Sequence, residues 1–109
     1  MEVWRFRVAV GAKSGRHSWW LVTDRGQRLA QAGDTFASAD AARSACMHFR
    51  DGVAQWRFEV FEDATGAQRW RVHDGGVVIA RSGTSFPNKT GAVNAAHEVR
   101  HHAKYAFEP

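Results

Sequence analysis

The chain has 109 residues, a length that fits one domain with an ordinary hydrophobic core and excludes a second independent one. Its net charge is +4, its pI is near 10.0 and twelve of its fifteen cations are arginines, a balance compatible with polyanion binding. No run reaches the ~20 apolar residues of a membrane span, the first residues lack a secretory signal, and one cysteine excludes an intrachain disulfide. We therefore expect a cytoplasmic protein that makes no contact with membranes.

Alternating apolar residues predict three strands in the first half of the chain. On the core side of the first strand we expect Trp4, Phe6, Val8 and Val10. Turn residues at 11–15 fold this strand back on a second, which points Trp19 and Leu21 toward the core. A tight turn at 24–26 leads to a third strand centred on Leu29, whose facing the pattern leaves open.

After Gly33 the apolar period changes from two residues to that of a helix, and Ser38 is a suitable N-cap. The residues that this helix is expected to bury are Ala42, Ala45, Cys46 and Phe49. Small residues predominate in this stripe, so we expect the helix to lie close to the sheet.

The same succession returns in the second half, which predicts a tandem repeat. The segment WRFRV at 4–8 recurs as WRFEV at 56–60, which is 52 positions later, and Trp19 matches Trp70 after 51. The spacing shortens within turns, where loops tolerate a change of length. The second helix, capped by Asn88, is expected to bury Ala92, Ala95, Ala96 and Val99.

The two copies are predicted to cover residues 1–52 and 53–109 of a single domain. No Pro/Gly/Ser-rich linker separates them, so we expect a shared core. Weak alternation at 105–107 indicates a short terminal strand.

The second half resembles the YegP-like domain of unknown function. The residues that carry the resemblance are Gly66, Arg69–Val72, Asp74–Gly76, Ile79–Ala80, Ser82–Gly83 and Lys89–Thr90. It implies an α+β fold: two tandem β(3)α(β) repeats that form one antiparallel sheet with two helices packed on one face, and that exchange the strand after each helix. The first half departs from this pattern at 33–35 and 39–40. The resemblance implies no activity, cofactor or catalytic residue.

The sharpest catalytic pattern is HEVRH at 97–101, a literal H-E-x-x-H sequence typical of zinc metalloproteases. At roughly 100° per residue, His97 and His101 each lie about 160° from Val99 in the apolar stripe, so both are predicted to face solvent. We therefore expect no metalloprotease and, more generally, no enzyme. Weak adventitious metal binding by His97, His101 and His102 stays an alternative to a solvated helix end.

Cys46 and His48 form no predicted catalytic pair, because they lie about 200° apart on a helix. Cys46 falls within the apolar stripe, which favours a small buried side chain.

The sheet face away from the helices is the predicted binding surface. The candidate residues on it are Arg5, Arg7, Trp20, Arg57, Arg71 and His73, with Glu59 as the main acid. The function is unknown from sequence. The leading hypothesis is a non-enzymatic interaction module that binds a protein partner or a second copy of itself through this face. The alternative is sequence-tolerant nucleic-acid binding, in which arginines contact phosphates and Trp20 stacks on a base.

Overall fold

The computed structural model describes residues 2–109. The first half contains β1 (Trp4–Val10), β2 (His17–Thr23), β3 (Arg28–Ala32) and α1 (Ala39–Gly52). The second half contains β4 (Arg57–Glu62), β5 (Gln68–Asp74), β6 (Val77–Ser82), α2 (Lys89–His102) and the short 3-10 helix η1 (Ala103–Tyr105). Both halves therefore have the order of three strands and a helix, while the copy boundary after residue 52 stays a prediction.

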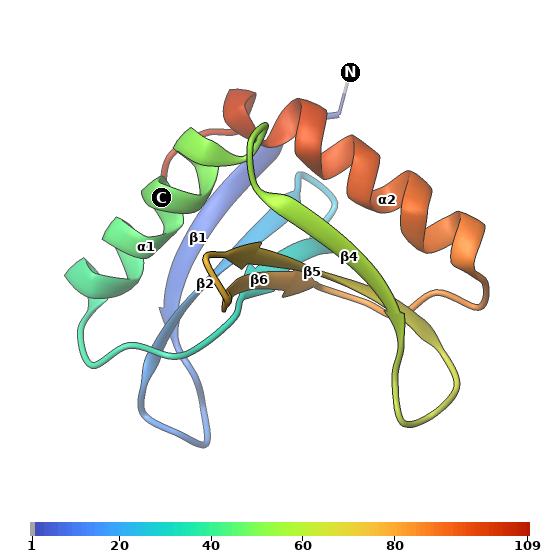
Figure 1. The fold of residues 1–109 in the computed structure, drawn as a ribbon. Helices are drawn as coiled ribbons and strands as arrows, with labels where there is room; N and C mark the ends of the chain where they lie inside the picture. Colours follow the sequence, from blue (N-terminus) through green and yellow to red (C-terminus); the bar gives the residue numbers. More distant parts are fainter. Residues whose placement is uncertain (1) are drawn as a thin grey trace.

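The six strands form one sheet in the order β1-β2-β3-β6-β5-β4, and every neighbouring pair is antiparallel. Figure 1 shows α1 and α2 on the same side of this sheet. The α+β class, with one antiparallel sheet and two helices packed on one face, is confirmed. The opposite side, here named the outer face, carries no helix. Within residues 2–109, neither helix has the length and apolar composition that a membrane span requires.

The two halves meet where β3 pairs with β6, and a glycine follows each of these strands. The amide of each glycine donates a 3.1 Å hydrogen bond to the facing strand. A Cβ on Gly33 would lie 2.1 Å from the carbonyl oxygen of Val78, and one on Gly83 2.5 Å from that of Arg28. Real Cβ atoms do not approach backbone this closely, so both positions require glycine.

Each helix begins at the predicted cap. Ser38 accepts a hydrogen bond from the amide of Ala41, and Asn88 accepts one from that of Gly91. The largest fully buried side chains are Phe6, Trp19, Leu21, Phe49, Val53, Trp70, Val72 and Val99. The predicted helical stripes are buried except at Ala45 and Ala95, which are partly exposed. One core therefore lies between the sheet and both helices.

Two local predictions are wrong. Val10 is 55% exposed because it is the last residue of β1, beside the hairpin turn. The tail forms no strand: residues 103–105 form η1, and only Phe107 pairs with β1, in a single parallel bridge. The next donor of a parallel ladder would be residue 109, and Pro109 has no N–H.

Candidate functional site

The outer face carries a row of side chains that crosses all six strands. Strand register places them side by side in the order Arg7, Trp20, Gln31, Arg81, Arg71 and Glu59. Side chains alternate between the two sides of a strand, so residues two positions away also point outward. All six candidate residues lie on this face: Arg5, Arg7, Trp20, Arg57, Arg71 and His73.

On the second half of the outer face, two of the three candidate cations, Arg71 and His73, are held by an internal network, whereas Arg57 is exposed. Arg71 Nε donates to Glu59 Oε1 at 2.6 Å, and His73 Nε2 lies 2.9 Å from the same oxygen. The hydrogen bond from Arg71, followed by that from His73, lowers the pKa of Glu59 to about 2. The Arg71 guanidinium also lies 4.2 Å from the ring centre of Phe61. Arg71 and His73 are therefore already engaged within the chain.

The first half of the outer face has no such acid. The outward residues of β1–β3, here named the basic half-face, include Arg5, Arg7, Trp20, Arg28 and Gln31. No carboxylate of residues 2–109 lies within ion-pair distance of these three arginines. The guanidinium of Arg28 lies 5.1 Å from the ring centre of Trp20, a cation–π contact. The basic half-face is therefore a cluster of unneutralised cations around one partly exposed tryptophan.

Trp20 separates two open hollows in this surface. The first, about 720 Å³, is lined by Arg7, Arg28 and Asp24, the last from the β2–β3 turn. The second, about 370 Å³, lies beside the β1–β2 turn and the residues that follow β3, and its lining includes Arg81 and Asp34. Both sides of the indole are therefore next to space that a flat or extended ligand can enter.

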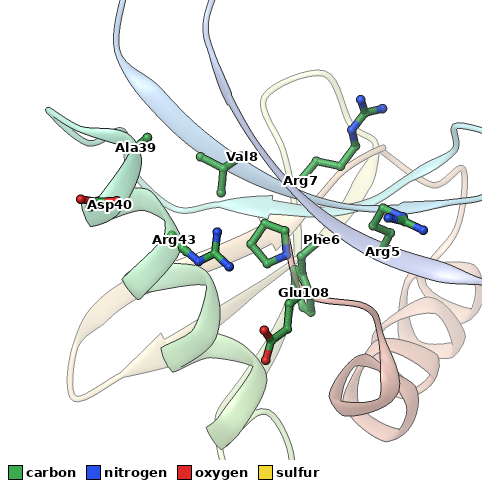
Figure 2. A pocket seen from close by; sticks show the side chains of 9 residues that line it. Arg5, Phe6, Arg7, Val8, Ala39, Asp40, Arg43 and Glu108 are labelled. Atoms are coloured by element: carbon green, nitrogen blue, oxygen red, sulfur yellow. The ribbon is translucent and has the colours of Figure 1, made fainter.

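A third hollow, about 650 Å³, lies on the helix side of β1. Figure 2 shows Arg43 pointing from α1 into this groove, whereas Arg5 and Arg7 point away from α1. Glu108 of the tail borders the groove and makes a 3.4 Å ion pair with Arg50. Arg5 and Arg7 also border this groove, so it adjoins the basic half-face along β1.

The two His of the H-E-x-x-H sequence face solvent, as predicted. The rings of His97 and His101 stack with their centres 6.0 Å apart, and both side chains are exposed. No group of three or more His, Cys, Asp or Glu side chains suited to a metal ion occurs within residues 2–109. His102 instead packs edge to face against Trp4, at 5.9 Å between ring centres.

Cys46 is buried in the core, as predicted. Burial raises the pKa of its thiol to about 12, so the thiolate is disfavoured. His48 on the same helix lies 3.0 Å from Asp74 instead. These two side chains do not meet.

No family model and no curated protein matches the sequence. Among solved structures, the chain is similar to YegP of E. coli, described as a protein of unknown function, with a TM-score of 0.79 and 11% identity over 98% of this chain and 91% of that one. It is also similar to the UPF0339 protein SO3888 of Shewanella oneidensis, with a TM-score of 0.71 and 10% identity over 96% and 89%. The fold is YegP-like.

The YegP-like fold places three residues in the site that the sequence did not assign to it: Arg28, Gln31 and Arg81. The sequence left the facing of the third strands open, because Val77, Val78 and Ile79 are all apolar. In the structure, irregular pairing occurs at Leu21/Val22 and again at Val72/His73. Such a bulge shifts the facing of a strand in a way that alternation alone does not reveal. The polar residues Arg28 and Gln31 among the apolar residues of β3 were the available signal.

Proposed function

We propose that this chain is a non-enzymatic binding module whose basic half-face holds single-stranded nucleic acid with little sequence preference. The observation that carries this proposal is the position of Trp20 between Arg7, Arg28 and Arg81, with open space on both sides. Single-strand binders combine a cationic surface for phosphates with an aromatic ring on which a base stacks. Every base has a π-face, so this mode of binding tolerates sequence.

Two features of the outer face favour a polyanion over a protein partner as its ligand. The fully buried core of a protein interface is more apolar than the rest of the surface. The exposed large hydrophobic side chains are Val3, Val10, Val77, Tyr105 and Phe107, which lie at strand ends and in the tail. The centre of the basic half-face instead carries arginine and glutamine around one tryptophan.

Fluorescence anisotropy of a labelled single-stranded RNA, titrated with the full chain at several salt concentrations, tests this function. Phosphate contacts release counterions, so we expect affinity to fall steeply between about 50 and 200 mM salt. Trp20→Ala removes the stacking platform and should weaken binding about 5- to 150-fold, from about 1–3 kcal/mol per stacked base. Arg7→Ala should reduce the slope of log K against log salt by about 1.

Arg43→Ala is the matched control, because this arginine belongs to α1 on the helix side of the sheet and lines neither of the hollows beside Trp20. It removes one positive charge and should leave the salt slope unchanged. Absence of binding by the wild type at about 50 mM salt would contradict the proposal. Equal affinity of Trp20→Ala and wild type would do so too. Association that is insensitive to salt would favour the alternative, a protein ligand.

A further inference from the structure

The two outer edges of the sheet are completed differently. At β1, the amide of Phe107 donates to the carbonyl of Trp4 at 3.0 Å, and the amide of Phe6 donates to Phe107 at 2.9 Å. The tail therefore covers part of this edge. At β4, no segment of residues 2–109 pairs with the outer edge. An unpaired edge strand is a template for another strand.

The pairing of β4 with β5 shows which backbone groups are open. In an antiparallel ladder, alternate residues exchange hydrogen bonds with the neighbour while the others direct N–H and C=O to the opposite side. The amide of Asp63 donates to Ala67 at the hairpin end, which sets odd-numbered residues of β4 to bond β5. Phe58, Val60 and Glu62 therefore present their backbone groups to the open edge.

One acceptor at the start of this edge is already satisfied. A guanidinium nitrogen of Arg100 donates to the carbonyl of Trp56 at 2.6 Å, and the guanidinium carbon lies 5.1 Å from the ring centre of Phe58. Arg100 thus donates a hydrogen bond to the carbonyl of Trp56, as the amide of Phe107 does to the carbonyl of Trp4. Its Nε is buried and has no hydrogen-bond partner within residues 2–109. The open stretch therefore begins at Phe58, with an arginine beside it.

We propose that two copies of this chain associate by antiparallel pairing of β4 with β4, about a two-fold axis at Val60. This inference goes beyond the nucleic-acid function and does not depend on it. In this register the backbone of Val60 forms hydrogen bonds with Val60 of the second copy, and the backbone of Phe58 forms them with Glu62 of the second copy. That carboxylate then approaches Arg100 on the helix side. On the outer face, Arg57 is opposite the second copy's Asp63.

The neighbouring registers are disfavoured by the same residues. Moving the axis by one position, to Glu59, places two carboxylates directly opposite each other, which is destabilising. Moving it to Phe58 would require the carbonyl of Trp56, which Arg100 already occupies. Only the axis at Val60 uses all three open residues and pairs opposite charges. The result is an isologous dimer in which two sheets join into one.

Sedimentation equilibrium of the full chain over a range of concentrations tests this dimer. The wild type should approach twice the 12.2 kDa mass of one chain as concentration rises. Val60→Pro removes an edge-facing N–H without breaking the ladder to β5, so the dimer dissociation constant should rise at least tenfold. The matched control is Val8→Pro, at the corresponding position of β1, which should leave dimerisation unchanged.

A second variant decides the question if Val60→Pro does not fold, as judged by tryptophan fluorescence. Glu62 is an exposed side chain, and Glu62→Arg would place a cation against Arg100 of the second copy. We expect at least a tenfold weaker dimer. A wild type that sediments as a monomer at every concentration would overturn the proposal, and so would a Glu62→Arg dimer as tight as the wild type. Neither outcome bears on RNA anisotropy, so the two proposals fail separately.

Discussion

The two halves share one backbone plan but fill it with different side chains. In the first half, α1 places Phe49 against Trp19, with ring centres 5.1 Å apart and nearly parallel rings. The corresponding position of α2 is Val99, and there Trp70 packs against Phe58 of the strand instead, at 5.4 Å. In the first half both the strand, through Phe6, and the helix, through Phe49, pack an aromatic ring on the buried tryptophan, whereas in the second half the strand alone does so.

The surfaces of the halves diverge further than their cores. Arg7 in β1 corresponds to Glu59 in β4, and this one difference changes the charge of the row across the outer face. Glu59 pairs with Arg71 and His73 in the second half, whereas no carboxylate of residues 2–109 pairs with Arg5, Arg7 or Arg28. The edges differ in the same way, since the tail covers part of β1 and leaves β4 open. Backbone geometry is therefore maintained where the halves meet, and binding chemistry differs where they face solvent.

The largest expected effect is at the junction of the halves. Gly33→Ala would drive a Cβ to 2.1 Å from a backbone carbonyl that cannot move without separating β3 from β6. We expect a loss of more than about 4 kcal/mol in the free energy of unfolding, measured by urea denaturation followed by tryptophan fluorescence. Gly83→Ala should cause a similarly large loss, because its Cβ would collide with the backbone carbonyl of Arg28 on the other side of the junction.

Gly91→Ala is the control for these two substitutions. Its Cβ would be 3.4 Å from Asn88 in the first turn of α2, so it fits. Alanine favours a helix over glycine by up to about 1 kcal/mol, and we expect a neutral or stabilising change. Stability loss equal to that of Gly33→Ala would show that close backbone approach is not the cause.

The next largest effect compares the two helices. Phe49 is fully buried between Trp19 and Phe6, so Phe49→Ala should cost about 3–5 kcal/mol. Val99→Ala removes fewer buried atoms at the corresponding position and should cost about 1–3 kcal/mol. Urea denaturation of both variants under one condition measures the difference. Equal losses would mean that the aromatic stack adds nothing to the first half.

A smaller effect is expected at the helix caps, where the halves use different residues for one purpose. Ser38→Ala and Asn88→Ala should each cost about 1 kcal/mol, because each leaves a first-turn amide without its acceptor. Exchanging the caps, as Ser38→Asn or Asn88→Ser, should change stability by only a few tenths of a kcal/mol. Thermal unfolding followed by circular dichroism distinguishes these two losses of stability. If exchanging the cap residues cost as much as replacing them by alanine, serine and asparagine would not be equivalent caps here.

Much of this architecture was predictable from the sequence. The alternation in the first two strands of each half, the capping residues and the apolar stripes gave the elements and their buried sides, because burial imposes its period on the sequence. The outward orientation of His97 and His101 followed from the same rule. The prediction of a strand in the tail was wrong. The weak alternation at 105–107 does not show that Pro109, which has no N–H, prevents further parallel pairing with β1.

The candidate site was less predictable than the fold. Sequence placed Arg71 and His73 in the same surface as Arg7 and Trp20, but it did not show that Glu59 binds the first pair. Glu59 lies 12 residues from Arg71 and 14 from His73 in the sequence, and strand register brings the three together. Apolar alternation predicts which face a residue is on, but not which residue of the neighbouring strand it faces. Arg28 and Arg81 were missed because bulges change the facing of the third strands. Long-range pairing therefore decides which cations are free.

The smallest expected effect concerns Glu59, the residue that separates the two halves of the outer face. Its pKa is about 2 in the folded chain and ordinarily near 4.5, because Arg71 and His73 stabilise the carboxylate. A lowered pKa in the folded state means that this contribution to stability is complete above about pH 4.5 and disappears as the pH falls toward 2. NMR titration of the side-chain carboxyl should give the low value, and Arg71→Ala should raise it toward 4.5. A normal pKa in the wild type would mean that Glu59 does not neutralise this half, and that both halves of the outer face are open to anions.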